Sequence, residues 1–325
     1  MTENNTTSWQ SFQRLRTHLE SIIVGQSALL DRLMIAMLTG GHVLLEGPPG
    51  LAKTTAVNAL ASGVHASAQR IQFTPDLMPG DLTGTEIYDA KSGEFRFVAG
   101  PVFHEIVLAD EINRAPPKVQ SALLEAMQEH QVTVNGVTRK LPELFIVMAT
   151  QNPLEQSGTY PLPEAQLDRF LLHIELDYPS PEDELEILRR DRKRHFGEDP
   201  MSVETPLHPD TVLQARHQVA EIHIEENVEQ YIVKLVGSTR HLGQYIPAWE
   251  NHIEVGASPR ASLALVRAAS AHAYLQGRDY VIPEDIIEML PDVLRHRIIV
   301  SFTALAENCD KNKIIQAIIE QVPMP

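Results

Sequence analysis

The chain has 325 residues, and because domains commonly hold about 100–200 residues, the length suggests two domains. Its 27 basic and 43 acidic residues give a net charge of −16, which argues against a generic binder of nucleic acid or anionic membrane but leaves a local basic channel open. The single cysteine, Cys309, excludes an intrachain disulfide and a multi-cysteine metal site. The sequence shows neither a secretory signal nor a membrane-length apolar run, so we expect a cytoplasmic protein.

The first two elements are predicted to be helices. Between residues 9 and 23, apolar side chains recur every three or four positions, which is the spacing of one helix face, and Thr7 or Ser8 can cap its start. A second helix is predicted over residues 27–38, and it ends at Gly40-Gly41.

Five short apolar runs then alternate with helical stretches or turns. They are residues 42–46 (HVLLE), 70–73 (RIQF), 106–109 (IVLA), 144–149 (LFIVMA) and 170–176 (FLLHIEL). Runs of this kind are typical of strands that are buried on both faces of a parallel sheet. We therefore predict an α/β domain with a parallel five-stranded sheet.

Two hairpins are predicted between these strands. One lies within residues 81–102, where polar and apolar residues alternate after the turn at Ser92-Gly93, and the other spans residues 132–138 with Asn135-Gly136 as its turn. Such hairpins either extend the central sheet or project from the surface, and we favour projection.

After Tyr178-Pro179-Ser180-Pro181, a linker in which each proline disfavours helix in the preceding residue, the chain is mostly helical. Helices are predicted to start at Pro181, at Ser258-Pro259 and near Pro283. We expect an α/β core over residues 1–178 and a helical domain over residues 179–325.

A glycine-rich loop between the first strand and the next helix is the strongest local signal. Residues 47–55 (GPPGLAKTT) fit the P-loop pattern at Gly47, Lys53 and Thr54, with Ala52 at the position that is usually glycine. Backbone amides at a helix start bind phosphate oxygens, the lysine neutralises β- and γ-phosphate charge, and the threonine hydroxyl binds Mg²⁺. The alternative is a strand-to-helix turn that ends in a surface lysine.

Polar groups also follow two other predicted strands. Asp110 and Glu111 directly follow the run at 106–109. Carboxylates at the end of a buried strand are costly in free energy unless a cation or another partner accompanies them. Asp110 is a candidate Mg²⁺ ligand, and Glu111 is a candidate base for the water that attacks the γ-phosphate. Asn152 follows the run at 144–149 and would lie near the same phosphate, although Asn152-Pro153 also suits a plain turn.

With these motifs in order, the chain resembles the MoxR family of AAA+ ATPases, in the helix-2-insert group. The matching segments are residues 45–54 (LEGPPGLAKT), 110–127 (DEINRAPPKVQSALLEAM), 149–153 (ATQNP), 164–170 (EAQLDRF) and 256–261 (GASPRA). The resemblance implies an AAA+ P-loop NTPase core of αβα layers, an all-α lid, binding of ATP or ADP with Mg²⁺, and a homo-oligomeric ring, expected to be a hexamer.

The resemblance also implies roles for matched residues. Nucleotide contacts are expected from Gly47, Pro48, Pro49, Gly50, Leu51, Ala52, Lys53, Thr54 and Thr55, and adenine contacts from Val24, Gly25 and Gln26. Thr54 and Asp110 would hold the metal, and Lys53, Glu111 and the sensor 1 residue Asn152 would act on the γ-phosphate and water.

Two further arginines have implied roles. Arg260 would be the sensor 2 arginine that reaches the γ-phosphate from the lid, and Arg169 resembles the arginine finger that enters a neighbouring subunit's site, with Arg114 as a rival. Arg260 could instead be a solvated arginine, and Arg169 could form an ordinary ion pair with Asp168 or Glu164.

The leading hypothesis is an ATP-hydrolysing, chaperone-like remodeller of a client protein. The resemblance implies a partner with a von Willebrand factor A domain and clients that mature or receive a metal or cofactor, but the sequence does not name them. The alternatives are a nucleic-acid-dependent motor, which the acidic charge disfavours, and a nucleotide-gated scaffold with little turnover.

Overall fold

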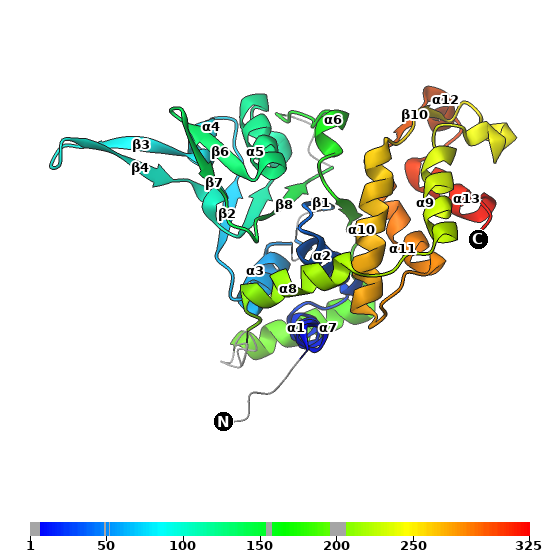
Figure 1. The fold of residues 1–325 in the computed structure, drawn as a ribbon, viewed down its shortest axis with the longest axis horizontal. Helices are drawn as coiled ribbons and strands as arrows, with labels where there is room; N and C mark the ends of the chain where they lie inside the picture. Colours follow the sequence, from blue (N-terminus) through cyan, green and yellow to red (C-terminus); the bar gives the residue numbers. More distant parts are fainter. Residues whose placement is uncertain (1–6, 49, 52, 154–157, 196–205) are drawn as a thin grey trace.

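A five-stranded parallel sheet lies at the centre of the computed structural model (Figure 1), which describes residues 7–48, 50, 51, 53–153, 158–195 and 206–325. Its strands are β1 (Val43–Glu46), β2 (Ala68–Gln72), β5 (Ile106–Asp110), β8 (Ile146–Gln151) and β9 (Leu172–Glu175), in the order β2-β5-β8-β1-β9. All four pairings are parallel, so the predicted sheet is confirmed.

Alternate strand residues supply two separate cores. In β1, Val43 and Leu45 face one core and Leu44 faces the other, and β8 divides in the same way. The first core is covered by α1 (Ser8–Ile22), α2 (Ser27–Thr39) and α3 (Lys53–Gly63). The second is covered by α4 (Pro79–Thr83), α5 (Pro117–Glu129) and α6 (Glu164–Leu167). Helices on both faces make the three αβα layers.

The first two helices begin and end where local chemistry predicts. Thr7 caps α1, because its side chain accepts from the Gln10 amide while the Gln10 side chain accepts from the Thr7 amide 3.1 Å away. Gly40 ends α2 in the left-handed region at φ +66°, which glycine adopts without a Cβ penalty.

The two hairpins are separate two-stranded sheets and do not extend the central sheet. They are β3 (Gly84–Asp89) with β4 (Glu94–Ala99), and β6 (Gln131–Val134) with β7 (Val137–Lys140). The β3–β4 hairpin projects far from the body (Figure 1). Its base is fastened to the other hairpin, because the Asn135 amide donates to Glu86 at 2.9 Å and the Arg139 guanidinium lies 3.9 Å from the centre of the Phe97 ring.

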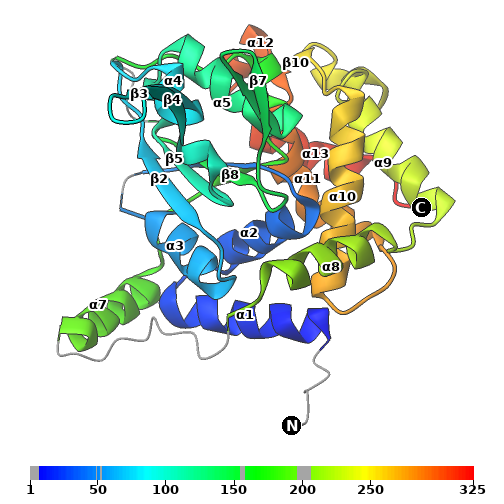
Figure 2. The same ribbon diagram turned by 60° about the vertical axis from the view of Figure 1, so that its left-hand side comes forward.

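The chain after β9 is mostly helical, as predicted. Its elements are α7 (Pro181–His195), α8 (Pro209–Ala220), α9 (Glu226–Ser238), α10 (Pro259–Leu275), α11 (Pro283–Leu294), α12 (Phe302–Ala306) and α13 (Lys311–Gln321), with a short pair of strands β10 (Ile253–Val255) and β11 (Ile299–Val300). Helix α8 contacts α1 and α2 as well as α10 (Figure 2), so the domain boundary at residue 178 stays a prediction. In the described part of the chain, no helix has the length and apolar character needed to span a membrane.

A buried ion-pair network joins α11 to α2 and β9. Arg32 of α2 lies 2.8 Å from both Asp292 and Glu288, and Asp292 also pairs with Arg295 at 3.1 Å. Arg295 in turn reaches Glu175 of β9. Because the Arg32 and Asp292 side chains are only 8% and 12% exposed, each charge depends on its partner.

The Asp292→Ala substitution should therefore lower the free energy of unfolding by about 3–5 kcal/mol, since it leaves the Arg32 and Arg295 guanidinium groups buried with fewer counter-charges. Urea unfolding followed by circular dichroism measures this loss. Glu254→Ala, at an exposed position of β10, is the matched control and should change the free energy by less than about 0.5 kcal/mol. Equal stability of the two variants would contradict the role given to the network.

Candidate active site

The loop between β1 and α3 is shaped by two glycines. A Cβ at Gly47 would lie 2.7 Å from the Leu176 carbonyl oxygen, so only glycine fits there without a shift. Gly50 has φ +86°, in the region that favours glycine. The rest of the predicted loop is present around them, except that Pro49 and Ala52 lie outside the described residues. The loop therefore has the backbone geometry that its composition predicts.

Lys53, the first residue of α3, turns back toward the loop. Its Nζ donates to the Gly47 carbonyl oxygen at 2.7 Å. Burial lowers the pKa of Lys53, while the nearby carboxylates of Asp110, Glu111 and Glu46 act in the opposite direction. These carboxylates favour the charged form, which is the form that binds phosphate.

Asp110 ends β5, and Glu111 follows it in a rare backbone conformation. Glu111 has φ +59° and ψ 51°, the left-handed region that a residue with a side chain seldom adopts. Such strain persists where the surrounding structure imposes it, and it is concentrated at functional sites. Here the Glu111 amide is held by the Thr150 hydroxyl at 2.9 Å, and the same hydroxyl donates to Asp110 Oδ1 at 2.5 Å.

Both carboxylates have further partners. Arg70 of β2 donates to Asp110 Oδ2 from Nη2 at 2.6 Å and from Nε at 3.1 Å. Gln72 donates to Glu111 Oε2 at 2.8 Å, and Arg114 lies 3.2 Å from the same oxygen. The register places Gln72 opposite Asp110 in the parallel pair of β2 and β5, which explains how these side chains meet.

These groups share one cavity of about 420 Å³. It is lined by Gly50, Leu51, Lys53, Thr54, Thr55, Arg70, Gln72, Asp110, Glu111, Thr150 and Asn152. The carboxyl ends of β1, β5 and β8 meet at this edge of the sheet, which is where ligands bind in open parallel α/β folds. The sequence-predicted groups Lys53, Thr54, Asp110, Glu111 and Asn152 are therefore brought together.

The donor set in this cavity fits Mg²⁺. The Thr54 hydroxyl and the Asp110 carboxylate would offer hard oxygen ligands, and Mg²⁺ is commonly bound by one or two carboxylates together with substrate phosphates. Among the described residues, no group of three or more His, Cys, Asp or Glu side chains could hold a metal without such help.

The predicted adenine segment lies near this edge but does not line the cavity. Gly25, with φ +71°, is packed against Asp183 at the start of α7, and the Gln26 side chain donates to the Asp177 carbonyl oxygen at 3.2 Å. Asp177 follows Leu176, whose carbonyl oxygen lies beside Gly47. The segment that includes Val24 is thus connected to the loop through the end of β9.

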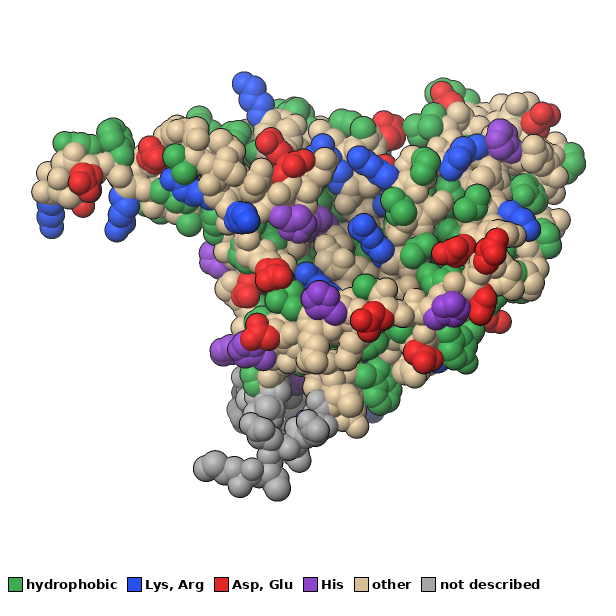
Figure 3. Space-filling view, viewed as in Figure 1, with side chains coloured by type: hydrophobic (Ala, Val, Ile, Leu, Met, Phe, Trp, Pro, Cys, Tyr) green, Lys and Arg blue, Asp and Glu red, His purple; other side chains and the backbone are tan. Residues whose placement is uncertain are grey.

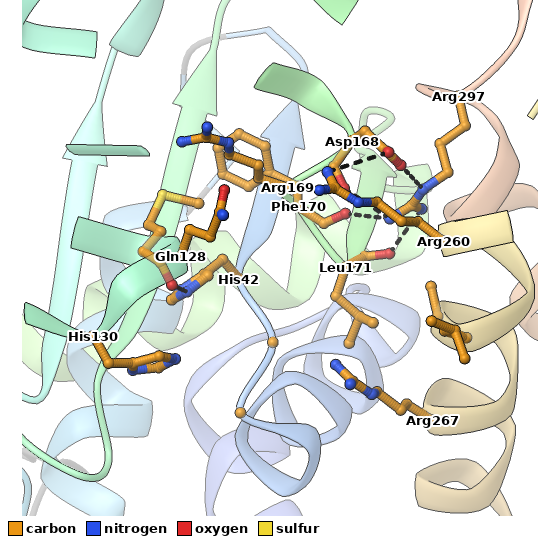
Figure 4. A pocket seen from close by; sticks show the side chains of 15 residues that line it. His42, Gln128, His130, Asp168, Arg169, Phe170, Leu171, Arg260, Arg267 and Arg297 are labelled. Carbon is orange, nitrogen blue, oxygen red and sulfur yellow. Dashed lines mark hydrogen bonds and ion pairs between the residues drawn. The ribbon is translucent and has the colours of Figure 1, made fainter. Parts of the chain in front are cut away.

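Arg169 and Arg260 lie elsewhere. They line a second pocket of about 370 Å³ beside Gly40, Gly41 and His42, which precede β1, and therefore at the opposite edge of the sheet from the loop. Figure 4 shows Arg169, Arg260, Arg267 and Arg297 around it, and Figure 3 shows basic side chains gathered over the face between the core and α10. The structure does not bring Arg260 into the cavity of its own Lys53.

One acidic residue holds two of these arginines. Asp168 lies 2.7 Å from Arg297 Nε and 3.6 Å from Arg260 Nη1. Asp168 is thus already paired, and no hydrogen bond or ion pair of the Arg169 or Arg267 guanidinium is found within the described residues. Four arginines and one carboxylate leave this pocket strongly positive in a chain whose net charge is −16.

The buried side chain of His42 also lines this pocket. Burial lowers the pKa of His42 to about 4, so its ring is neutral. Its Nδ1 accepts from the Val147 amide at 3.0 Å, and its Nε2 donates to the Met127 carbonyl oxygen at 3.1 Å. The ring therefore ties β1 to β8 and α5 and adds no positive charge.

Sequence reasoning missed several polar residues of these two pockets, among them Arg70, Gln72, Thr150, Arg267 and Arg297. The positions of Arg70 and Gln72 in the site follow only from the pairing of β2 with β5. The polar residues after the strand at 144–149 predict a role for Asn152, but the contact with Asp110 is made by Thr150, two residues earlier. Arg267 lies seven residues after Arg260 on α10, a spacing that returns to the same helix face and could have been noticed.

Comparisons with known proteins show the family to which the chain is similar. Residues 42–172 match the family described as "ATPase family associated with various cellular activities (AAA)", and residues 249–318 match an AAA lid domain. Chaperone MoxR1 of Mycobacterium tuberculosis is 46% identical over 97% of this chain and 82% of its own length. Protein MoxR of Methylorubrum extorquens is 32% identical over 98% of this chain and 97% of its own length.

A solved structure gives the same result in three dimensions. A crystal structure from Cytophaga hutchinsonii, provisionally assigned as an ATPase, is 46% identical, covers 98% of this chain and 96% of its own, and superposes with a TM-score of 0.91. With the strand order, the two predicted motifs and near full-length relatives in agreement, the chain belongs to the MoxR-type AAA+ ATPases.

Proposed function

We propose that the chain hydrolyses ATP with Mg²⁺ in the cavity around Lys53. The observation that carries this proposal is that Lys53, Thr54, Asp110, Glu111 and Asn152 line one cavity, although they come from three separate strand ends. ADP would bind there as the product.

Each side chain has a role in this reaction. The backbone N–H groups of the loop 47–55, apart from its two prolines, hold the phosphates, Lys53 neutralises their charge, and Thr54 and Asp110 would hold Mg²⁺, which supplies charge stabilisation when bound. Glu111 accepts a proton from the attacking water, and Asn152 orients that water against the γ-phosphate. The segment of Val24, Gly25 and Gln26 would contact adenine.

The arginines act between subunits in this proposal. Arg169 and Arg260 lie at the edge of the sheet opposite Lys53, so one chain cannot bring them to its own γ-phosphate without rearrangement. A head-to-tail ring sets one edge of each copy against the other edge of its neighbour, and such rings close when the rotation fits. We infer a hexamer in which Arg169 and Arg260 face the neighbour's nucleotide. Arg114 is the weaker candidate, because it pairs with Glu111 of its own chain.

The work done by hydrolysis is proposed to be remodelling of a client protein in the cytoplasm. The exposed apolar side chains of the β3–β4 hairpin, including Ile87, Tyr88 and Phe95, support client contact there. By family resemblance, the partner would carry a von Willebrand factor A domain and the client would mature or take up a metal or cofactor. The core and lid would divide at residue 178.

Replacing the proposed base tests hydrolysis against a scaffold role. Glu111→Gln should retain Mg·ATP binding in calorimetry and lose at least about 10²-fold in phosphate release, since general-base catalysis contributes about 10²–10⁴-fold. Glu125→Gln, on the exposed side of α5, makes the same charge change and should keep full activity. Unchanged turnover in Glu111→Gln would contradict Glu111 as the base, negligible turnover in the wild type would favour a nucleotide-gated scaffold, and DNA-dependent turnover in the wild type would favour a nucleic-acid motor.

Mixing inactive variants tests the intersubunit role of Arg169. Arg169→Ala and Glu111→Gln should each be inactive alone. After subunits exchange in an equal mixture, about one quarter of the head-to-tail interfaces should pair an intact Glu111 with an intact Arg169. Those interfaces should regain activity. Phosphate release before and after subunit exchange measures this. Full activity of Arg169→Ala alone, or a mixture without gain, would overturn the assignment.

The same design locates the action of Arg260. A mixture of Arg260→Ala with Glu111→Gln should also regain phosphate release, because the pocket groups Arg260 with Arg169. A mixture of Arg260→Ala with Arg169→Ala should stay inactive, because both losses fall on the same face. If Arg260 acted on its own chain's nucleotide, the first mixture would stay inactive and the second would regain phosphate release.

A further inference from the structure

Asp110, the proposed metal-holding carboxylate, already has a cation beside it. Arg70 donates to Oδ2 from two nitrogens, at 2.6 and 3.1 Å, while Thr150 donates to Oδ1. Both oxygens of the carboxylate are therefore engaged by groups of the same chain. The Asp110 side chain is only 16% exposed, so Arg70 supplies a counter-charge where little water reaches the carboxylate.

The fold delivers Arg70 to this position without burying it. Strand β2 is at the edge of the sheet and pairs in parallel with β5, and Arg70 and Gln72 point to the same side while Ile71 packs into the second core. The Gln72 side chain accepts from Arg70 Nη2 at 2.9 Å, which orients the guanidinium. Because 52% of the Arg70 side chain is exposed, it can leave Asp110 for water at little desolvation cost.

Arg70 and Mg²⁺ compete for the Asp110 carboxylate. Mg²⁺ accepts only oxygen ligands in a nearly ideal octahedron, and a guanidinium has donors and no acceptor to offer. The two cations also repel each other at the short distance that a shared oxygen would impose. Lys53 does not compete in the same way, because its amine donates to the Gly47 carbonyl oxygen and makes no hydrogen bond to Asp110 among those of the described residues.

We propose that Arg70 is a built-in counterion for Asp110 that Mg²⁺ must displace when the metal–nucleotide complex binds. This inference rests on the proposed function, because it assigns a regulator to the same metal site. Arg70 is thus a positioning residue: it holds the Asp110 carboxylate oriented before the metal arrives, and it lowers the advantage that Mg²⁺ gives to nucleotide binding.

The quantity that reports this competition is the ratio of ADP dissociation constants in EDTA and in excess Mg²⁺. Calorimetry on the full chain gives this ratio without any turnover. In Arg70→Gln the ratio should rise about two- to fivefold over the wild type, which is the range expected for loss of a half-exposed ion pair. Arg70→Lys keeps the charge but loses the two-nitrogen contact, so its ratio should fall between the two.

Arg16→Gln is the matched control, because Arg16 also pairs with carboxylates, Glu20 and Asp31, but does not line the cavity. Its ratio should equal that of the wild type. An unchanged or smaller ratio in Arg70→Gln, with the wild type binding Mg·ADP, would overturn this inference alone. If Arg70→Gln does not fold, a wild-type ratio in Arg70→Lys would overturn it. A wild-type chain that binds no Mg·ADP would overturn the proposed function as well.

Discussion

The constraint on which this structure depends is that the parallel strands end together. Because β1, β8 and β5 are neighbours with the same direction, the amides after β1, the carboxylates after β5 and the amide side chain after β8 meet at one edge. Phosphate binding and metal binding need opposite charges within a few ångströms of each other, and this edge supplies both. Thr150 connects them further, because one hydroxyl holds the Glu111 backbone and the Asp110 carboxylate.

The same parallel arrangement explains why the arginines are separated from the carboxylates. Arg169 precedes β9, so it belongs to the edge where strands begin, and Arg260 joins it through Asp168. The position of Asp168 is itself fixed by Arg297, which also donates to the Phe170 carbonyl oxygen at 2.7 Å. The arginines and the carboxylates lie at opposite edges of the sheet, so a second copy of the chain is the simplest way to bring them together. The proposed chemistry would therefore depend on assembly.

Much of the core could be predicted from the sequence because its signals are local. Buried strands are continuous apolar runs, and the loop around Lys53 and the acidic pair at Asp110 are recognisable from adjacent residues. The contacts of Arg70 and Gln72 could not be predicted, because they depend on the register between two strands about forty residues apart. The location of Arg260 could not be predicted either, because it depends on how α10 and α11 dock onto the core.

The most direct test of the central claim is a structure of the chain determined with Mg²⁺ and a non-hydrolysable ATP analogue. The account predicts density for the triphosphate along the loop of residues 47–55 and its backbone N–H groups, with the metal beside Asp110 and Arg169 of an adjacent copy facing the γ-phosphate. Nucleotide bound away from Lys53, or copies arranged so that Arg169 faces solvent, would contradict it.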